Sequence, residues 1–162
     1  FSIDDNRICF LIADVSGKGV PAALFMMTAK TMIKDYALNC ESTAEIFTTV
    51  NARLCENNEA GMFATAWIGI LDVRTMTLQY TNAGHNYPIL LRQGQASEMK
   101  TVHGLFLAGL EFTQYRQSQL QLEPLDRLLL YTDGVTEAKN SSSHCQKFLK
   151  KPSPKRTFMK KF

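Results

Sequence analysis

Two aspartates stand at the ends of apolar runs, each shortly before glycine. Asp14 follows the apolar run 8–12 and precedes a turn with two glycines. Asp133 follows the run 127–132 and is itself followed by glycine. Carboxylate oxygens are hard ligands, so two such groups brought together suit Mg²⁺ or Mn²⁺ rather than zinc. The alternative is that both are turn aspartates that accept local hydrogen bonds. The spacing alone leaves both interpretations open.

The residues after Asp14 have the order of a glycine turn and a helix start. Pro21 suits the first turn of a helix, and apolar residues recur at helical spacing over residues 22–36. Lys18 lies at this predicted helix start, where it is either a phosphate-neutralising residue or an ordinary solvated lysine. The Ser-Gly-Lys sequence lacks the G-x-x-x-x-G-K-[ST] spacing, which excludes a P-loop.

The elements expected to position these residues are helices early in the chain and antiparallel strands later. Ser42 and Glu45 have the pattern of a capping box, which predicts a second helix that ends near Glu56 with one buried apolar stripe. Residues 62–73 and 75–81 predict a strand hairpin. Further strands are expected at 8–14, 88–92 and 115–122, a buried strand at 127–132, and turns at 4–6, 82–86 and 93–95. This order favours an α+β layered domain over alternating βαβ units.

Length and composition allow one domain with a substantial core. The chain has 162 residues, of which 45% are apolar, so disorder of the whole chain is excluded. No apolar run approaches the length of about 20 residues that a membrane span needs. The four cysteines show no C-x-x-C pair, which favours a cytoplasmic protein with reduced thiols over a disulfide scaffold or zinc site.

The charge is divided unevenly along the chain. Residues 139–162 contain eight Lys or Arg and no Asp or Glu. Residues 1–138 contain ten basic and fifteen acidic residues, a formal charge of −5. We therefore expect residues 1–138 to form the domain and residues 139–162 to be a disordered basic tail. A lysine-rich run without interleaved aromatic residues is usually solvated, so no nucleic acid is expected as a partner.

Three motifs occur in the order found in a known enzyme family. They are Ala13-Asp-Val-Ser-Gly-Lys-Gly-Val-Pro-Ala-Ala-Leu24, Asn82-Ala-Gly-His-Asn86 and Leu128-Leu-Leu-Tyr-Thr-Asp-Gly-Val-Thr-Glu-Ala138. With them, the sequence over residues 1–138 resembles the PPM-type serine/threonine phosphatases, and within these the SpoIIE-like and RsbU-like branch. The segments 62–65 and 104–109 fit the same branch more weakly.

The resemblance implies a four-layer αββα sandwich of two antiparallel sheets flanked by helices, incomplete at both ends here. It also implies a dinuclear Mn²⁺ or Mg²⁺ site between the sheets. By position, Asp14 would bridge the metals, Val15 would offer its backbone carbonyl, and Asp133 would hold one metal from the opposite sheet. Metal-bound water would attack phosphorus, so no catalytic side chain is required. His85, in the second motif, is interpreted as fixing a loop.

The implied function is hydrolysis of phosphoserine or phosphothreonine on a regulatory protein of the anti-sigma-factor-antagonist type, with an upstream sensor domain fused in the full-length protein. Two acidic motifs of the family have no counterpart here, one upstream of Phe1 and one near the domain's C-terminus. We therefore expect a truncated or frame-shifted product with impaired metal binding. The alternatives are a catalytically degenerate module that binds a phosphoprotein and a non-functional fragment.

Overall fold

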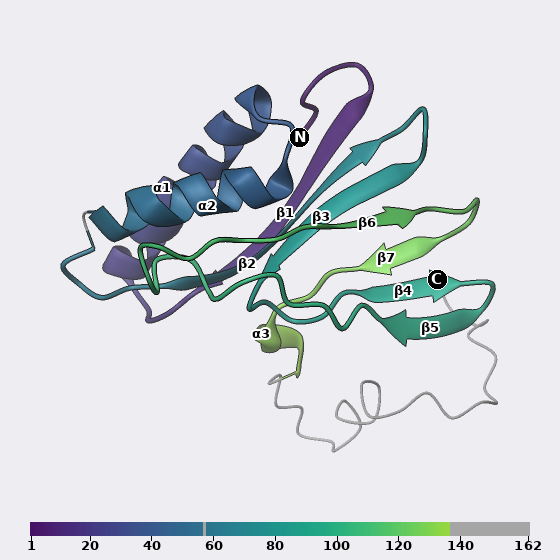
Figure 1. Cartoon of the computed structure of the whole chain (residues 1–162). Coiled ribbons are helices and arrows are strands. Elements are labelled where there is room, and N and C mark those ends of the chain that lie inside the picture. Colours follow the sequence, from purple (N-terminus) through teal and green to yellow (C-terminus); the bar gives the residue numbers. More distant parts are fainter. Residues whose placement is uncertain (57, 137–162) are drawn as a thin grey trace, which may run out of the picture.

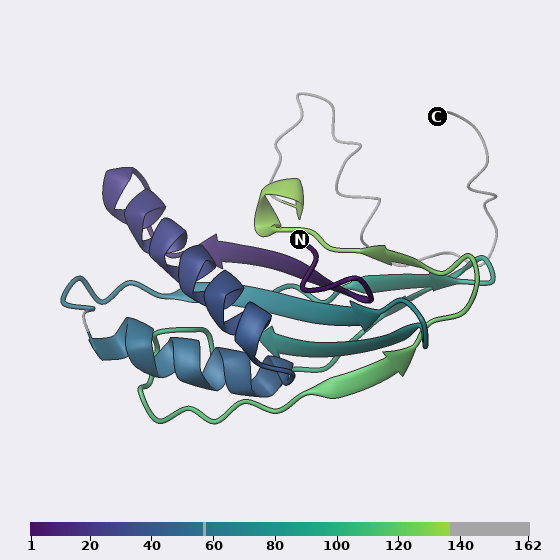
Figure 2. The same cartoon turned by 90° about the horizontal axis from the view of Figure 1, so that it is seen from above.

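Two antiparallel sheets stack face to face, and two helices cover the outer face of the larger one (Figure 1; Figure 2). The computed structural model describes residues 1–56 and 58–136. Sheet A has the strand order β1-β2-β3-β6 and sheet B has the order β5-β4-β7. The strands are β1 (Arg7–Val15), β2 (Ala64–Asp72), β3 (Thr77–Ala83), β4 (Ile89–Arg92), β5 (Gln95–Glu98), β6 (Ser118–Gln121) and β7 (Arg127–Leu129).

The helices are α1 (Val20–Asn39), α2 (Thr43–Glu56) and the single turn α3 (Asp133–Thr136). The backbone carbonyl of Gly19, which has a φ of 80°, accepts from the Ala23 amide at 3.1 Å as α1 begins. At the start of α2, Ser42 Oγ accepts from the Glu45 amide at 3.2 Å, which is one half of the predicted capping box. No helix in the described part of the chain is long and apolar enough to cross a bilayer.

Sheet A separates two apolar clusters. The cluster toward the helices contains the predicted stripe of α2 and small residues of α1, which allow the helix to approach the sheet closely. These buried helical residues are Ala29, Ile33, Ala37, Ile46, Phe47, Val50 and Leu54. The cluster between the sheets is built on Trp67, Leu78 and Tyr80 of sheet A, with Leu128 of β7 and Leu130 just after it packed against it. Apolar burial on both faces of sheet A fixes the strand register.

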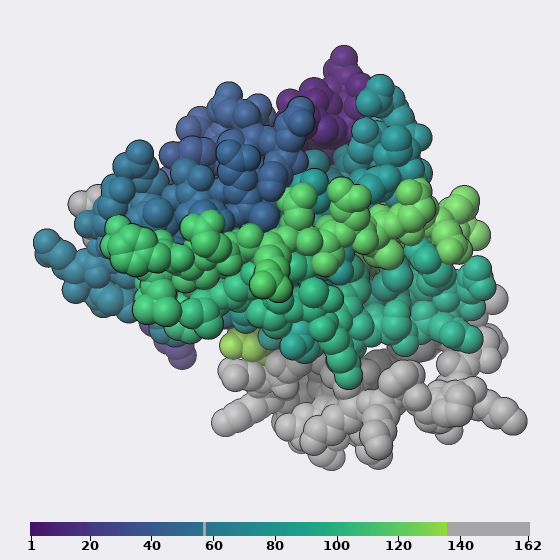
Figure 3. All heavy atoms as spheres, in the orientation of Figure 1, coloured from purple at the N-terminus to yellow at the C-terminus, as the bar shows by residue number. Residues whose placement is uncertain are grey.

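The predicted hairpin is confirmed as β2 and β3, which pair with Ile68 opposite Thr81. The long connection from β5 to β6 crosses the front of the molecule beside α2 (Figure 3). The side chain of Asn51 on α2 holds this connection, because it donates to the Leu110 carbonyl at 2.8 Å and accepts from the Ala108 amide at 2.9 Å. A buried amide thus satisfies backbone groups that no sheet pairs.

Sheet B departs from the sequence expectations in two places. The turn predicted at 93–95 is confined to Gln93 and Gly94, and Gln95 already begins β5. The strand predicted as buried at 127–132 is short and half-exposed, with Leu129 54% accessible. The physical reason is that no helix of the described residues covers the outer face of sheet B (Figure 1). The predicted α+β fold of two antiparallel sheets with helices is confirmed, and among the described residues the helical layer flanks sheet A. The predicted basic tail, residues 139–162, lies outside them.

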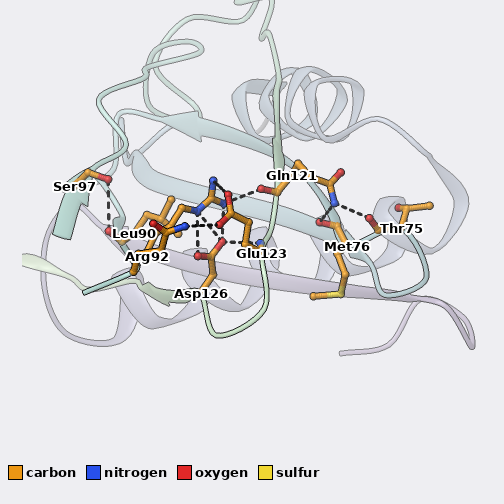
Figure 4. Close-up of polar contacts among 9 residues, drawn as sticks. Thr75, Met76, Leu90, Arg92, Ser97, Gln121, Glu123 and Asp126 are labelled. Atoms are coloured by element: carbon orange, nitrogen blue, oxygen red, sulfur yellow. Dashed lines mark hydrogen bonds and ion pairs between the residues drawn. The ribbon is translucent and has the colours of Figure 1, made fainter. Parts of the chain in front are cut away.

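An arginine joins the two sheets at the end of the sandwich where β4 finishes (Figure 4). Arg92 Nη2 lies 2.6 Å from Asp126 Oδ2 and 2.8 Å from the Gln121 carbonyl of sheet A. Arg92 Nη1 lies 2.9 Å from Glu123 Oε1. We call Arg92, Gln121, Glu123 and Asp126 the arginine clamp. Its planar guanidinium satisfies a carboxylate whose side chain is only 5% exposed.

Candidate metal centre

A pocket of about 240 Å³ opens at the opposite end of the sandwich from the arginine clamp. It is formed where β1 ends, where β2 begins, in the connection from β3 to β4, and at the start of α3. The lining residues are Asp14, Val15, Ser16, Phe63, Thr65, Gly84, His85, Asn86 and Asp133. Both sheets therefore contribute to this one pocket.

The end of β1 places Asp14 at the pocket wall. Asp14 pairs with Thr65 of β2 in the antiparallel ladder, so their side chains project from the same face. The corner beyond is closed by Ser16, whose amide donates to the Phe63 carbonyl at 2.8 Å and whose Oγ accepts from the Phe63 amide at 2.9 Å. Gly17, with a φ of 90°, then redirects the chain toward α1.

The segment after β7 carries Asp133 to the same pocket. The Tyr131 carbonyl lies 3.5 Å from Asn86 Nδ2 of the β3–β4 connection. The Val135 amide donates to the Thr132 carbonyl at 3.1 Å, which closes the turn around Asp133. Asp14 and Asp133, which come from opposite sheets, thus line one cavity. Lys18 is exposed and is not among the lining residues.

The donor set of the pocket suits a hard cation. It offers two carboxylates, the Val15 backbone and the hydroxyls of Ser16 and Thr65. Mg²⁺ usually binds through one or two carboxylates and keeps several waters, for which the cavity has room. No group of three or more His, Cys, Asp or Glu within the described ranges could hold a metal ion. The residues present therefore fit one sparsely held Mg²⁺ or Mn²⁺.

Both the backbone and the ring of His85 are held by hydrogen-bonding partners. Its amide donates to Asn82 Oδ1 at 2.7 Å, and its carbonyl accepts from Asn82 Nδ2 at 3.1 Å. Its ring Nδ1 lies 3.0 Å from Thr65 Oγ1. Burial lowers the pKa of the imidazole, and the Asp14 carboxylate partly opposes that shift. The neutral ring is therefore favoured at neutral pH.

The predicted site residues Asp14, Val15 and Asp133 line the pocket, whereas Ser16, Thr65 and Asn86 were not predicted to line it. The register of β1 on β2 brings Thr65 opposite Asp14, and this pairing cannot be read from a single sequence. All three residues lie in motifs or segments that carry the family resemblance, and these were the available signal.

Comparison with known proteins gives consistent results. The family model described as stage II sporulation protein E (SpoIIE) matches residues 4–154. The chain is 29% identical to the phosphoserine phosphatase RsbU of Bacillus subtilis, over 94% of this chain and 44% of that protein. It is also 29% identical to the protein IcfG of Synechocystis, over 86% of this chain and 26% of that protein. The chain thus spans less than half the length of these curated relatives.

Solved structures resemble the fold. The RsbU and RsbW domains of Rv1364c from Mycobacterium tuberculosis superpose with a TM-score of 0.71 at 27% identity, over 82% of this chain and 37% of that one. The PP2C phosphatase domain of SpoIIE from Bacillus subtilis superposes with a TM-score of 0.74 at 16% identity, over 90% of this chain and 42% of that one. The second match supports the fold alone.

Proposed function

We propose that this chain is a metal-dependent phosphatase that removes phosphate from phosphoserine or phosphothreonine on a protein. The basis is its family, because the chain belongs to the stage II sporulation protein E (SpoIIE) family. The observation that carries the proposal is the meeting of Asp14 and Asp133, one from each sheet, in a single pocket. A turn aspartate with a purely local role has no reason to face a second one across a sandwich.

The roles of the pocket residues follow from their chemistry. Asp14 and Asp133 would hold a divalent cation, and the Val15 carbonyl would complete its inner set of protein oxygens. The bound Mg²⁺ or Mn²⁺ would supply Lewis-acid activation of water and neutralise phosphate charge. Without a cation, two carboxylates repel a phosphate dianion, so the same residues also make substrate binding depend on metal. Lys18, in the turn that leads from the pocket to α1, would meet the remaining phosphate charge at the rim.

The cofactor could be Mn²⁺ or Mg²⁺, since both prefer oxygen ligands. A solved structure of RsbX in complex with magnesium, 22% identical over 82% of this chain and 63% of that one, has a similar fold with a TM-score of 0.67. A second metal, as in the dinuclear site that the resemblance implies, would need ligands in addition to those described.

The substrate we propose is a phosphorylated regulatory protein of the anti-sigma-factor-antagonist type. Support comes from the name phosphoserine phosphatase carried by the relatives RsbU and RsbP of Bacillus subtilis. The pocket is open to the surface rather than enclosed, which suits a phosphorylated side chain presented by a protein. A cytoplasmic location belongs to the same proposal and agrees with the free thiols of Cys9, Cys40 and Cys55.

Phosphate release from a phosphoserine peptide, measured with the 162-residue chain and MnCl₂, tests the activity. We expect turnover that EDTA abolishes and that Asp14→Asn lowers by more than about 100-fold. Removing a partner of a metal ligand already costs about 10–100-fold in affinity or activity, and removing the ligand itself should cost more. Phosphate release that persists in EDTA would overturn the proposal.

The charge-matched control is Asp5→Asn. Asp5 is an exposed acid in the turn before β1, at the far end of that strand from the pocket. Its replacement changes net charge equally and should leave the rate unchanged.

A binding module without turnover is the second candidate. The observation in its favour is the absence of any three-ligand acidic cluster in the described part of the chain. Tight binding of the phosphopeptide together with no phosphate release would establish this candidate in place of the enzyme.

A further inference from the structure

His85 lies at the junction of the two sheets and is 5% exposed. One side of its ring is anchored to sheet A, because Nδ1 lies 3.0 Å from Oγ1 of Thr65. Thr65 is the ladder partner of Asp14, so the ring is tied to the strand pair that carries the first pocket carboxylate. Its backbone is fixed independently by the side chain of Asn82.

The other side of the ring has unused hydrogen-bonding capacity. Nε2 is fully buried and has no hydrogen-bond partner among the described residues. The Tyr131 carbonyl lies close by, 3.5 Å from Nδ2 of the adjacent Asn86, and it partly opposes the lowering of the His85 pKa, although Nε2 makes no hydrogen bond to it. Because most buried polar atoms are paired, an unpaired one beside two carboxylates calls for a functional explanation.

The ring proton can reside on Nε2. The Thr65 hydroxyl rotates freely and can donate to Nδ1, which leaves Nε2 as the protonated nitrogen of a neutral imidazole. The segment that begins at Tyr131 is the nearby candidate acceptor for Nε2–H, because the Tyr131 carbonyl lies 3.5 Å from Nδ2 of the adjacent Asn86, and this segment reaches Asp133 two residues later. His85 is therefore placed between the two elements that carry the pocket carboxylates.

We propose that His85 is a positioning residue that links Thr65 to the Tyr131 carbonyl and so sets the separation of Asp14 and Asp133. The proposal rests on the function proposed above. Asp14 and Asp133 would hold the cation, and donation from Nε2–H to the Tyr131 carbonyl would keep the two carboxylates at their separation with or without it. Metal ligands elsewhere are oriented in the same way by hydrogen-bonded neighbours.

Two substitutions of His85 test the contributions of Nδ1 and Nε2 separately. Glutamine places an amide nitrogen near the position of Nε2, whereas asparagine places its amide near the position of Nδ1. We expect His85→Asn to weaken Mn²⁺ binding, measured by calorimetry, by about 10–100-fold. We expect His85→Gln to stay within about threefold of the unsubstituted chain, because it keeps the Nε2 side and Asn82 still ties its backbone to sheet A. Equal weakening by both substitutions, or by neither, would overturn the proposal.

A second measurement needs no metal. The Val135 amide, bonded to the Thr132 carbonyl, reports on the turn around Asp133 through its hydrogen-exchange rate. In metal-free protein, His85→Asn should speed this exchange more than His85→Gln does. If the unsubstituted chain bound no Mn²⁺, the proposed function would fail, and this exchange difference would still decide the role of His85.

His103 supplies the matched control. It is buried to a similar degree, but both ring nitrogens are bonded, Nδ1 to the Asn82 amide at 2.9 Å and Nε2 to Ser118 Oγ at 2.8 Å. Replacing His103 by Asn or Gln should lower the unfolding midpoint without separating the two variants in Mn²⁺ affinity. The same Asn-against-Gln difference at His103 would contradict a specific role for His85.

Discussion

The two ends of the sandwich handle negative charge in opposite ways. At the arginine clamp, the Asp126 carboxylate meets a guanidinium at 2.6 Å and the Glu123 amide at 2.8 Å (Figure 4). At the pocket, Asp14 and Asp133 face one cavity, and none of the described residues that line it is Lys or Arg. The clamp supplies its own cation, whereas we propose that the pocket takes a cation from solution.

Breaking the clamp should have the largest effect on stability. Arg92→Met keeps the length of the stem but leaves the enclosed Asp126 carboxylate without its cation, which is more costly than losing a surface pair. We expect the thermal unfolding midpoint to fall by about 5 °C or more, measured by calorimetry. Arg74→Met is the control, because the Arg74–Asp72 pair at 3.4 Å is exposed and should contribute little. Equal losses in the two variants would contradict the clamp.

Acid should weaken the clamp end. The hydrogen bond from Arg92 holds the pKa of Asp126 below its ordinary value of 3.8. The unfolded chain then binds more protons than the folded one, so this contribution is present above that value and is lost as pH falls through the folded pKa. Unfolding midpoints measured from pH 6 to pH 2 should decline less steeply in Arg92→Met than in the unsubstituted chain. Parallel curves would show that the carboxylate is not coupled to Arg92.

How well the sequence predicts the pocket and the arginine clamp depends on how far apart the interacting residues lie along the chain. Asp14 and α2 were predictable because their signals are local: a glycine turn after an apolar run, and a cap followed by a stripe. The Arg92–Asp126 pair joins residues 34 positions apart, and the Thr65–His85 contact joins residues 20 apart. Such pairs depend on strand register and on the stacking of two sheets, which a single sequence does not encode visibly.

Sheet B shows two further limits. The side chains of β5 are all exposed, so Gln95–Glu98 has no apolar alternation to indicate a strand. Three consecutive leucines predicted a buried strand at β7, yet burial depends on what covers a face, and the described residues leave Leu129 uncovered. The meeting of Asp14 and Asp133 was expected from the family resemblance, because spacing alone left two turn aspartates as an alternative.

At the pocket end we expect a smaller change in thermal stability than at the clamp, and an increase rather than a loss. Asp14→Asn removes one of two negative charges that share a cavity, so metal-free protein should gain stability, with a midpoint raised by about 1–3 °C. Saturating Mn²⁺ should stabilise the unsubstituted chain and not the variant, because only a ligand that binds the folded state shifts the midpoint. Thermal scans with and without MnCl₂ check both signs. A variant that is less stable without metal would place Asp14 among the structural residues.

Mn²⁺ binding measured by calorimetry tests the central claim most directly, that carboxylates from two sheets hold one cation. The account predicts binding by the unsubstituted chain, a loss of affinity of more than about 100-fold in both Asp14→Asn and Asp133→Asn, and no loss in Asp5→Asn. An Asp133→Asn protein that binds Mn²⁺ as tightly as the unsubstituted chain would contradict it.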